Sequence, residues 1–274
     1  MKKTFIIIYF LFSIISCKKE EYTIENLNGN KISALGHAGM GFSTTYPVNS
    51  YESILKCLNL GADGTEIDVQ MTKDSVLIAF HDQDLSENTN LKGGVNSLTW
   101  NEIKEADYIQ THYLNYSIHS LDQLFSHIEN LHTYRFIFDC KLYTSGTNTN
   151  QFYTSYMNAV IALMQKFKLQ NNVYLASSST GFISLFKNKN SDYKFLINPL
   201  SFTAGFDTAL SFKLFGIQMS TNDISREQIK MAHDNNLWVS IWETNSNKDQ
   251  NKAIKKNPDF IITDNVKGLI KLIK

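Results

Sequence analysis

Residues 61–82 read GADGTEIDVQMTKDSVLIAFHD. This stretch contains two apolar-rich runs, Gly64–Met71 and Val76–Phe80, which we predict to be strands. Too few residues separate Asp68 from Val76 for a crossover between parallel strands, which takes roughly a dozen. The four residues Thr72-Lys73-Asp74-Ser75 are instead a turn. The two runs therefore form an antiparallel hairpin that rises from the first of them.

Short apolar runs alternate with amphipathic stretches along the rest of the chain, from about residue 31 onward. Strand–helix alternation of this kind is typical of a parallel sheet. With the hairpin counted as part of one strand, eight parallel strands remain. We predict a TIM (β/α)8 barrel over residues 31–274 as a single domain, with a β-hairpin extending from the second strand. The remaining predicted strands are Ile32–His37, Arg135–Lys141, Asn172–Ser177, Tyr193–Ile197, Phe215–Met219, Leu237–Trp242 and Phe260–Thr263. The predicted amphipathic stretches include Ser50–Leu60, Leu121–Leu131, Asn150–Phe167 and Arg226–Asn235.

The charges are balanced, with 26 basic and 26 acidic side chains. A general polyanion binder would carry a basic excess, so we expect no nucleic-acid partner. All but two of the basic residues are lysines, the exceptions being Arg135 and Arg226. This limits the places where a bidentate phosphate contact can form.

The N-terminus has the pattern of a targeting segment. Three residues with two lysines precede an apolar run, Thr4–Ile15, that is too short to span a bilayer comfortably. The small residue Ser16 and then Cys17 follow, as in the bacterial lipoprotein signals that this segment resembles. We expect residues 1–16 to be a signal peptide and residues 17–30 to be a lipidated Cys17 with a polar tether. The protein would then be exported and membrane-anchored, on the periplasmic or cell-surface side; an ordinary signal peptide with an incidental cysteine is the alternative.

The other cysteines, Cys57 and Cys140, lie in a helical and a strand pattern. An exported protein could pair them in a disulfide, whereas their apolar neighbours favour two separate buried thiols. The sequence leaves both possibilities open.

Carboxylates alternate with apolar residues in the predicted second strand. Side chains at i and i+2 share a face, so Glu66 and Asp68 would point to the barrel axis and Ile67 and Val69 to the helices. Two carboxylates in one cavity repel each other unless a cation lies between them. Oxygen ligands favour a hard ion, and we expect one divalent cation, Mg²⁺ or Ca²⁺.

Asp139 and Lys141 repeat this geometry on the next barrel strand, so Asp139 is a third candidate ligand. Lys141 offers a charge for a phosphate oxygen, or a structural ion pair inside the barrel. His37 ends the first predicted strand and His81 ends the hairpin. At the carboxyl ends of barrel strands, where active sites lie, two histidines can serve as general acid and base.

These pieces, in this order, resemble the glycerophosphodiester phosphodiesterase family. Residues 61–74 resemble its GADGxExDVQxTKD block, His81-Asp82 its His-Asp segment, and Asp139-x-Lys141 its Glu-x-Lys. Weaker likenesses follow downstream: Ala176-Ser177-Ser178 resembles the family's strand ending in serine, Ile241–Asn245 its WTVN segment, and Phe260–Asp264 its GIITD. The likeness covers residues 31–274.

The resemblance implies a TIM barrel of the phosphodiesterase type that hydrolyses glycerophosphodiesters to glycerol phosphate and an alcohol with one divalent cation. By position, the metal ligands would be Glu66, Asp68 and Asp139, and the acid and base would be His37 and His81. The implied substrate-binding residues are Lys141, Trp242 and Asn49. The partners expected are thus a small phosphodiester and, through Cys17, a membrane; no protein partner is implied.

The chain departs from the family at four places. Ala38 stands where the family has an Arg after the first His, and Pro47-Val48-Asn49-Ser50 replaces PENT. Glu87-Asn88-Thr89 stands in place of RTT, and Asp139 replaces a longer Glu. Phosphate would therefore be bound by the metal and Lys141 rather than by an arginine, which indicates an altered substrate.

Two alternatives remain at this stage. One is a phospholipase or sphingomyelinase D-like phosphodiesterase acting on intact lipids, which would suit a membrane anchor. The other is a non-catalytic lipoprotein that binds a phosphorylated ligand, which would suit the missing Arg and Glu.

Overall fold

The predicted hairpin is present. β2 (Gly64–Met71) pairs with β3 (Leu77–Ala79) in antiparallel fashion, with Gln70 opposite Ile78. The backbone amide of Thr72 donates to the carbonyl of Val76 at 2.9 Å and closes the turn. The computed structural model describes residues 22–42, 45–110, 116–189 and 192–274. The predicted signal peptide and Cys17 lie outside these residues.

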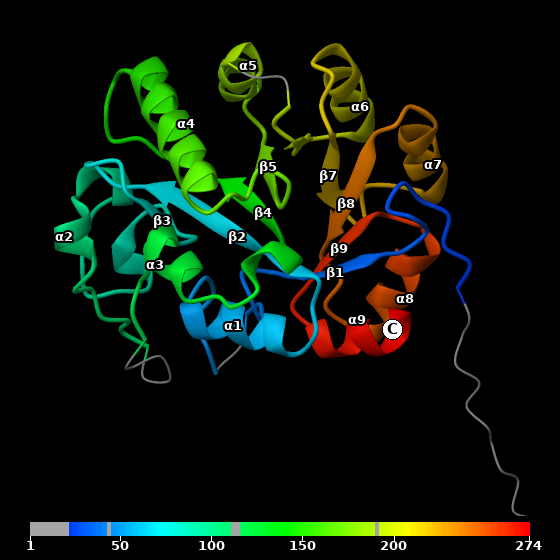
Figure 1. Ribbon diagram of the computed structural model, residues 1–274, viewed down its shortest axis with the longest axis horizontal. Helices are drawn as coiled ribbons and strands as arrows, with labels where there is room; N and C mark the ends of the chain where they lie inside the picture. The colour runs from blue at the N-terminus through cyan, green and yellow to red at the C-terminus, as the bar shows by residue number, and fades with distance from the viewer. Residues whose placement is uncertain (1–21, 43–44, 111–115, 190–191) are drawn as a thin grey trace, which may run out of the picture.

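The barrel closes through β2. Its first two residues pair in parallel with β1 (Ser33–Gly36), and most of its length pairs in parallel with β4 (Arg135–Cys140). The sheet runs in the order β1-β9-β8-β7-β6-β5-β4-β2, with β3 outside the ring. Because every neighbouring pair in the ring is parallel, the predicted TIM barrel with its hairpin is confirmed (Figure 1). The remaining strands are β5 (Val173–Ser177), β6 (Phe195–Ile197), β7 (Gly216–Ser220), β8 (Trp238–Trp242) and β9 (Phe260–Thr263).

Helices connect the strands on the outside of the ring (Figure 1). They are α1 (Tyr51–Asn59), α2 (Trp100–Ile103), α3 (Leu121–Ser126), α4 (Thr149–Lys166), α5 (Thr180–Lys189), α6 (Phe202–Ser211), α7 (Arg226–Asp234), α8 (Asn247–Lys255) and α9 (Val266–Ile273). The predicted stretch Leu121–Leu131 is helical only to Ser126, with His127 as the C-cap, and a separate turn of 3-10 helix follows at Leu131–Thr133 after left-handed Asn130.

The core has an outer and an inner part. Ile67 and Val69 pack with the helices in the outer cluster, as the strand alternation predicts. Inside the ring, Leu35, Ile137 and Phe260 belong to a smaller apolar cluster. The same inward faces carry a polar layer nearer the carboxyl ends of the strands, formed by Glu66, Asp68, Asp139 and Gln218. The apolar cluster is thus the floor of a polar cavity.

The connection from β3 to α3 has an apolar cluster of its own, which includes Ile78, Phe80, Leu85 and Ile103. This connection replaces the single helix that would follow the second strand of a simple barrel, and it forms a small extension beside the hairpin. Cys57 and Cys140 are both buried and free, so the reading of two separate thiols is confirmed. Among the described residues, no helix has the length and hydropathy needed to cross a membrane.

Candidate active site

Three carboxylates converge on the inside of the barrel. Glu66 and Asp68 come from β2 and Asp139 from β4, and the Cα atoms of Asp68 and Asp139 are partners in the strand register. One oxygen from each of the three lies within 4.8 Å of the others. Glu66 and Asp68 are buried, and Asp139 is half-buried. The structure therefore brings together the three ligands that the sequence predicts.

Lys141 lies between two of these carboxylates. Its Nζ is 2.7 Å from Oδ2 of Asp139 and 3.0 Å from Oδ1 of Asp68. Burial alone lowers the pKa of Lys141, but the charges of Asp68 and Asp139 outweigh it and raise the pKa. The ammonium group is therefore charged at neutral pH and neutralises part of the acidic cluster.

One lysine does not neutralise the whole cluster. Burial, followed by the charge of Asp68, raises the pKa of Glu66 well above its usual value. Burial raises the pKa of Asp139 as well, although Lys141 counteracts it. Glu66 and Asp139 thus resist ionisation in the absence of a further cation. Together with Asp68 they offer a set of oxygen donors that suits a hard divalent ion. The residues present thus fit a Mg²⁺ or Ca²⁺ site.

His37 follows β1 and faces the same cavity. Its Nδ1 is 2.7 Å from Oδ1 of Asp264, directly after β9, which leaves Nε2 as the ring nitrogen available to a ligand. Burial lowers the pKa of His37, but the hydrogen bond to Asp264 and the charge of Glu66 raise it to about 9. Asp264 was not among the residues predicted to serve the site, because its partner lies at the other end of the chain.

His81 faces the cavity from the hairpin side. Its Nδ1 is 2.9 Å from Oδ1 of Asp82, and the same carboxylate accepts a hydrogen bond from Asn88. Buried Gln70 donates to the carbonyls of Phe80 and Asp82 at 2.9 and 2.8 Å, which ties this segment to β2. Both histidines are thus held at Nδ1 by a carboxylate, and the predicted pair meets in one cavity.

The cavity has a volume of about 420 Å³. Besides the two histidines, the three carboxylates and Lys141, it is lined by apolar Phe42, Pro199, Met219 and Trp242. The ring of Phe42 lies 5.6 Å from that of His37 and 6.4 Å from that of His81, in edge contacts. Trp242 is 39% exposed at the end of β8, so its predicted position in the wall is observed.

The loop after β1 is shaped by glycines and by Ala38. A Cβ on Gly41 would come within 2.5 Å of the Asp264 backbone, so only glycine permits the approach that pairs His37 with Asp264. Ala38 adopts a left-handed conformation with φ of 47° and is 1% exposed. Its amide donates to Oε2 of Glu66 at 3.0 Å. Ala38 thus orients a candidate ligand through its backbone.

Asn49 does not line the cavity. It is 1% exposed, its Nδ2 donates to Oδ2 of Asp68 at 2.8 Å, and its Oδ1 accepts from the Asp68 amide at 3.0 Å. Both polar groups of the Asn49 side chain are therefore committed to Asp68. The structure does not place Asn49 where it could bind substrate, contrary to the sequence prediction. Asn49 instead holds the carboxylate of Asp68 in place.

Two amides in the cavity wall were not predicted from the sequence. Asn198 follows β6 and donates to Oδ1 of Asp139 at 3.4 Å, and Gln218 is an inward residue of β7. The side-chain carbonyl oxygens of both are buried without a hydrogen-bond partner in the structure. Such oxygens can accept from the hydroxyl groups of a polyol. Strand alternation in GIQMS could have indicated Gln218.

Neither arginine reaches this cavity. Arg135 stands at the start of β4, where its Nη1 donates to Asn28 and Ser33, and Arg226 begins α7 outside the cavity lining. Among the residues that line the cavity, the basic side chains are Lys141 and the two histidines.

Comparisons with known proteins agree with this geometry. Residues 40–267 match the Glycerophosphoryl diester phosphodiesterase family. Glycerophosphodiester phosphodiesterases of Caldanaerobacter subterraneus subsp. tengcongensis and Bacillus altitudinis are 24% and 26% identical, over 86% and 83% of this chain and 96% and 93% of theirs.

Solved structures share the fold. A Thermotoga maritima glycerophosphodiester phosphodiesterase has a TM-score of 0.69 at 20% identity, covering 88% of this chain and 98% of that one. An Oleispira antarctica phosphodiesterase in complex with the product sn-glycerol-3-phosphate has a TM-score of 0.76 at 16% identity, covering 88% and 96%. The chain belongs to the glycerophosphoryl diester phosphodiesterase family and is a phosphoric diester hydrolase.

Proposed function

We propose that the chain hydrolyses glycerophosphodiesters to glycerol phosphate and an alcohol, with one divalent cation, Mg²⁺ or Ca²⁺, held by Glu66, Asp68 and Asp139. The observation that carries this proposal is the single cavity in which two carboxylate-held histidines meet three convergent carboxylates. The product complex of the Oleispira antarctica relative supports the reaction. Family membership supports the metal requirement, because this family is metal-dependent.

The chain's own residues supply proton transfer and binding. When bound, a divalent ion polarises the phosphodiester oxygens and neutralises charge that develops on them. Lys141 stabilises the same charge as a point cation in place of the arginine that Ala38 replaces. One of His37 and His81 removes the proton of the attacking oxygen, through the nitrogen not bonded to its carboxylate, and the other protonates the leaving alcohol. Asn198 and Gln218 are placed to accept from glycerol hydroxyls.

Replacing either histidine tests the acid–base assignment. His37→Ala and His81→Ala should each reduce release of glycerol phosphate from glycerophosphocholine by about 10²-fold or more, since general acid–base catalysis contributes that much. Melting temperatures should stay near that of the wild type, and exposed His132→Ala at the other end of the barrel is the matched control. Full activity in either cavity variant would remove that histidine from the mechanism.

One observation favours a second candidate, a phosphodiesterase acting on intact lipids. Phe42, which is 66% exposed, and Trp242, which is 39% exposed, line the cavity, and fully exposed Leu200 follows Pro199 of the lining. Such side chains could contact an acyl chain. Product analysis with lysophosphatidylcholine beside glycerophosphocholine separates the two. The non-catalytic alternative is not retained, because the chain belongs to a family of hydrolases.

We further propose that residues 1–16 are removed and that Cys17 is lipidated, so that the enzyme is exported and membrane-anchored. The support is the sequence pattern of residues 1–17. Labelled fatty acid should enter the wild-type chain in a bacterial host and be absent from Cys17→Ser. Equal labelling of both would refute lipidation at this residue.

A further inference from the structure

The end of the barrel opposite the cavity is covered by the segment Tyr22–Asn30. Tyr22 and Ile24 pack against the outer core, and the side chain of Asn26 donates to the carbonyls of Lys31 and Pro258 at 2.9 and 2.8 Å. The hollow at this end is lined by Tyr22 and Ile24 together with residues that start strands or end helices, such as Arg135 and Ile273. We call this end the base.

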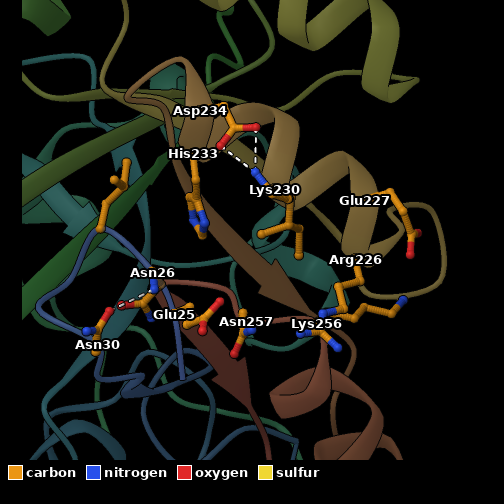
Figure 2. Close-up of a pocket in the computed structure, with 12 residues that line it drawn as sticks. Glu25, Asn26, Asn30, Arg226, Glu227, Lys230, His233, Asp234, Lys256 and Asn257 are labelled. Carbon is orange, nitrogen blue, oxygen red and sulfur yellow. Dashed lines mark hydrogen bonds and ion pairs between the residues drawn. The ribbon is translucent and has the colours of Figure 1, made fainter. Parts of the chain in front are cut away.

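The segment is fixed through a buried carboxylate. Asp259, fully buried before β9, accepts from the amide of Asn28 at 3.0 Å and lies 3.0 Å from Nε2 of His233. Figure 2 shows Asn26 and Asn30 of the segment facing His233 and the rest of α7 across a groove of about 430 Å³. Removing the segment would leave Asp259 with fewer partners, so the second half of the expected tether is part of the folded barrel.

A lipid on Cys17 would therefore be attached close to the base. Only residues 18–21 separate Cys17 from Tyr22, a span of at most about 17 Å when fully extended. Along β4, about 20 Å of strand already separates Arg135 at the base from Lys141 in the cavity. Phe42 and Leu200 lie in the loops that follow β1 and β6, beyond the carboxyl ends of these strands, and we call this edge of the cavity the rim. The tether is too short to carry an anchor from the base past the wall to the rim.

The balanced net charge hides an uneven distribution. The loops that lead into strands at the base, and the C-terminus, carry Lys31, Lys168, Lys194, Lys213 and Lys274. Several helices that end here also have lysines in the last turn, where they complement the helix dipole. The same loops also carry Glu25, Asp63, Glu129, Asp192 and Asp259, of which Asp63 is paired with Lys274 and Asp259 is buried against His233, so the lysines of the helix ends supply the positive excess at the base.

The opposite end of the barrel is acidic. The loops that follow strands carry Asp82, Asp84, Asp223, Glu243 and Asp264, in addition to the carboxylates inside the cavity. A lysine-rich base attracts an anionic lipid surface, whereas an acidic mouth is repelled by it. Charge and tether length thus favour the same orientation.

We propose that the chain sits base-down on an anionic lipid surface, with its catalytic mouth turned to the aqueous phase, and takes its phosphodiester from solution. This inference rests on the proposed lipidation and deepens the proposed function. It also decides between the two substrate classes: a lipid in the anchoring leaflet cannot reach the cavity, whereas a deacylated diester can diffuse into it.

Energy transfer to acceptor lipids tests the orientation. The lipidated chain is reconstituted on vesicles of phosphatidylcholine with added phosphatidylglycerol and carries one dye, at Leu200→Cys on the rim or Lys213→Cys at the base. Cys57 and Cys140 are buried and leave the dye site unique once Cys17 is lipidated. The base dye should transfer energy strongly and the rim dye weakly. Equal or stronger transfer from the rim dye would overturn the proposal.

Charge reversal tests the lysine-rich base separately, in a chain that begins at Lys18 and has no lipid. Lys31, Lys168 and Lys213 are exposed and become Glu; vesicle sedimentation should then show at least about a tenfold loss of partition onto anionic vesicles. Exposed Lys73, Lys92 and Lys104, beyond β2 and away from the base, become Glu in the matched control, which should bind nearly as the wild type. Equal losses in both would show that net charge alone acts and would overturn the oriented contact.

Measuring the activity of the anchored enzyme tests the inference about the substrate. Vesicle-anchored enzyme should hydrolyse dissolved glycerophosphocholine at the rate of detergent-solubilised enzyme and release no head group from the vesicle's own lipids. Head-group release from those lipids would overturn the inference. Loss of hydrolysis in every form would instead count against the proposed function and leave the energy-transfer result standing.

Discussion

Replacing Asn49 with Ala tests how the structure orients a metal ligand. The change removes the 2.8 Å bond to Oδ2 of Asp68 and leaves the buried Asp68 amide without the partner it has at 3.0 Å. A hydrogen bond to a charged group contributes about 1.5–3 kcal/mol, and an unsatisfied buried donor costs about 1–3 kcal/mol. Loss of a residue that orients a metal ligand typically weakens metal affinity or activity by about 10–100-fold.

The assay has two parts. Calorimetric titration of Mg²⁺ and Ca²⁺ into metal-free protein gives the affinity, and glycerol phosphate release gives kcat/KM. The matched control is Asn172→Ala at the base, because that amide also makes two hydrogen bonds, both at 2.8 Å, to the carbonyls of His132 and Tyr134. Both variants should melt at lower temperature, and only Asn49→Ala should lose cation affinity. Unchanged affinity in Asn49→Ala would refute its positioning role.

Three further predictions concern the same cavity. Asp264→Asn replaces the charged acceptor at Nδ1 of His37 with a neutral amide, which no longer fixes the His37 tautomer and lowers the pKa of His37, so kcat should fall by about 10²-fold or more and the pH–rate profile should shift. Because the folded-state pKa of His37 is raised to about 9, its ion pair with Asp264 stabilises the metal-free protein fully below about pH 6.5 and loses that effect as pH rises through 9. The difference in melting temperature between wild type and Asp264→Asn should therefore shrink between these pH values. A difference that stays constant with pH would contradict this. Lys141→Gln should lower kcat/KM by about 10²-fold or more and destabilise the metal-free protein, since Asp68 and Asp139 lose their shared cation; a divalent ion should restore much of the melting temperature. A variant as active and as stable as the wild type would contradict the role given to Lys141.

Much of the barrel and its site was predictable from local pattern. The spacing from Asp68 to Val76 excludes a crossover, and the alternation of Glu66 and Asp68 with Ile67 and Val69 fixes which side chains face inward. Period and spacing are local properties, so one sequence suffices to read them. The structure confirms the hairpin and the convergence of both carboxylates with Asp139.

The partners of these residues were not predictable in the same way. Asp264 meets His37 only because β9 pairs with β1 when the ring closes, and Asn49 meets Asp68 only because the loop after β1 folds over β2. Neither contact has a signature in a short window. The sequence likewise predicted a polar tether where the structure has the docked segment Tyr22–Asn30. Its asparagines bind a backbone carbonyl and a buried carboxylate that lie more than 200 residues away, so no local pattern indicates the docking.

Cation-dependent hydrolysis in this cavity can be tested by comparing turnover with and without a divalent ion. Wild-type enzyme is incubated with glycerophosphocholine in Mg²⁺, in Ca²⁺ and in EDTA, and glycerol phosphate and choline are quantified beside Glu66→Gln. We expect both products in at least one metal, none in EDTA, and a strong loss in Glu66→Gln at the same metal concentration. Equal turnover in EDTA, or unchanged turnover in Glu66→Gln, would contradict this expectation.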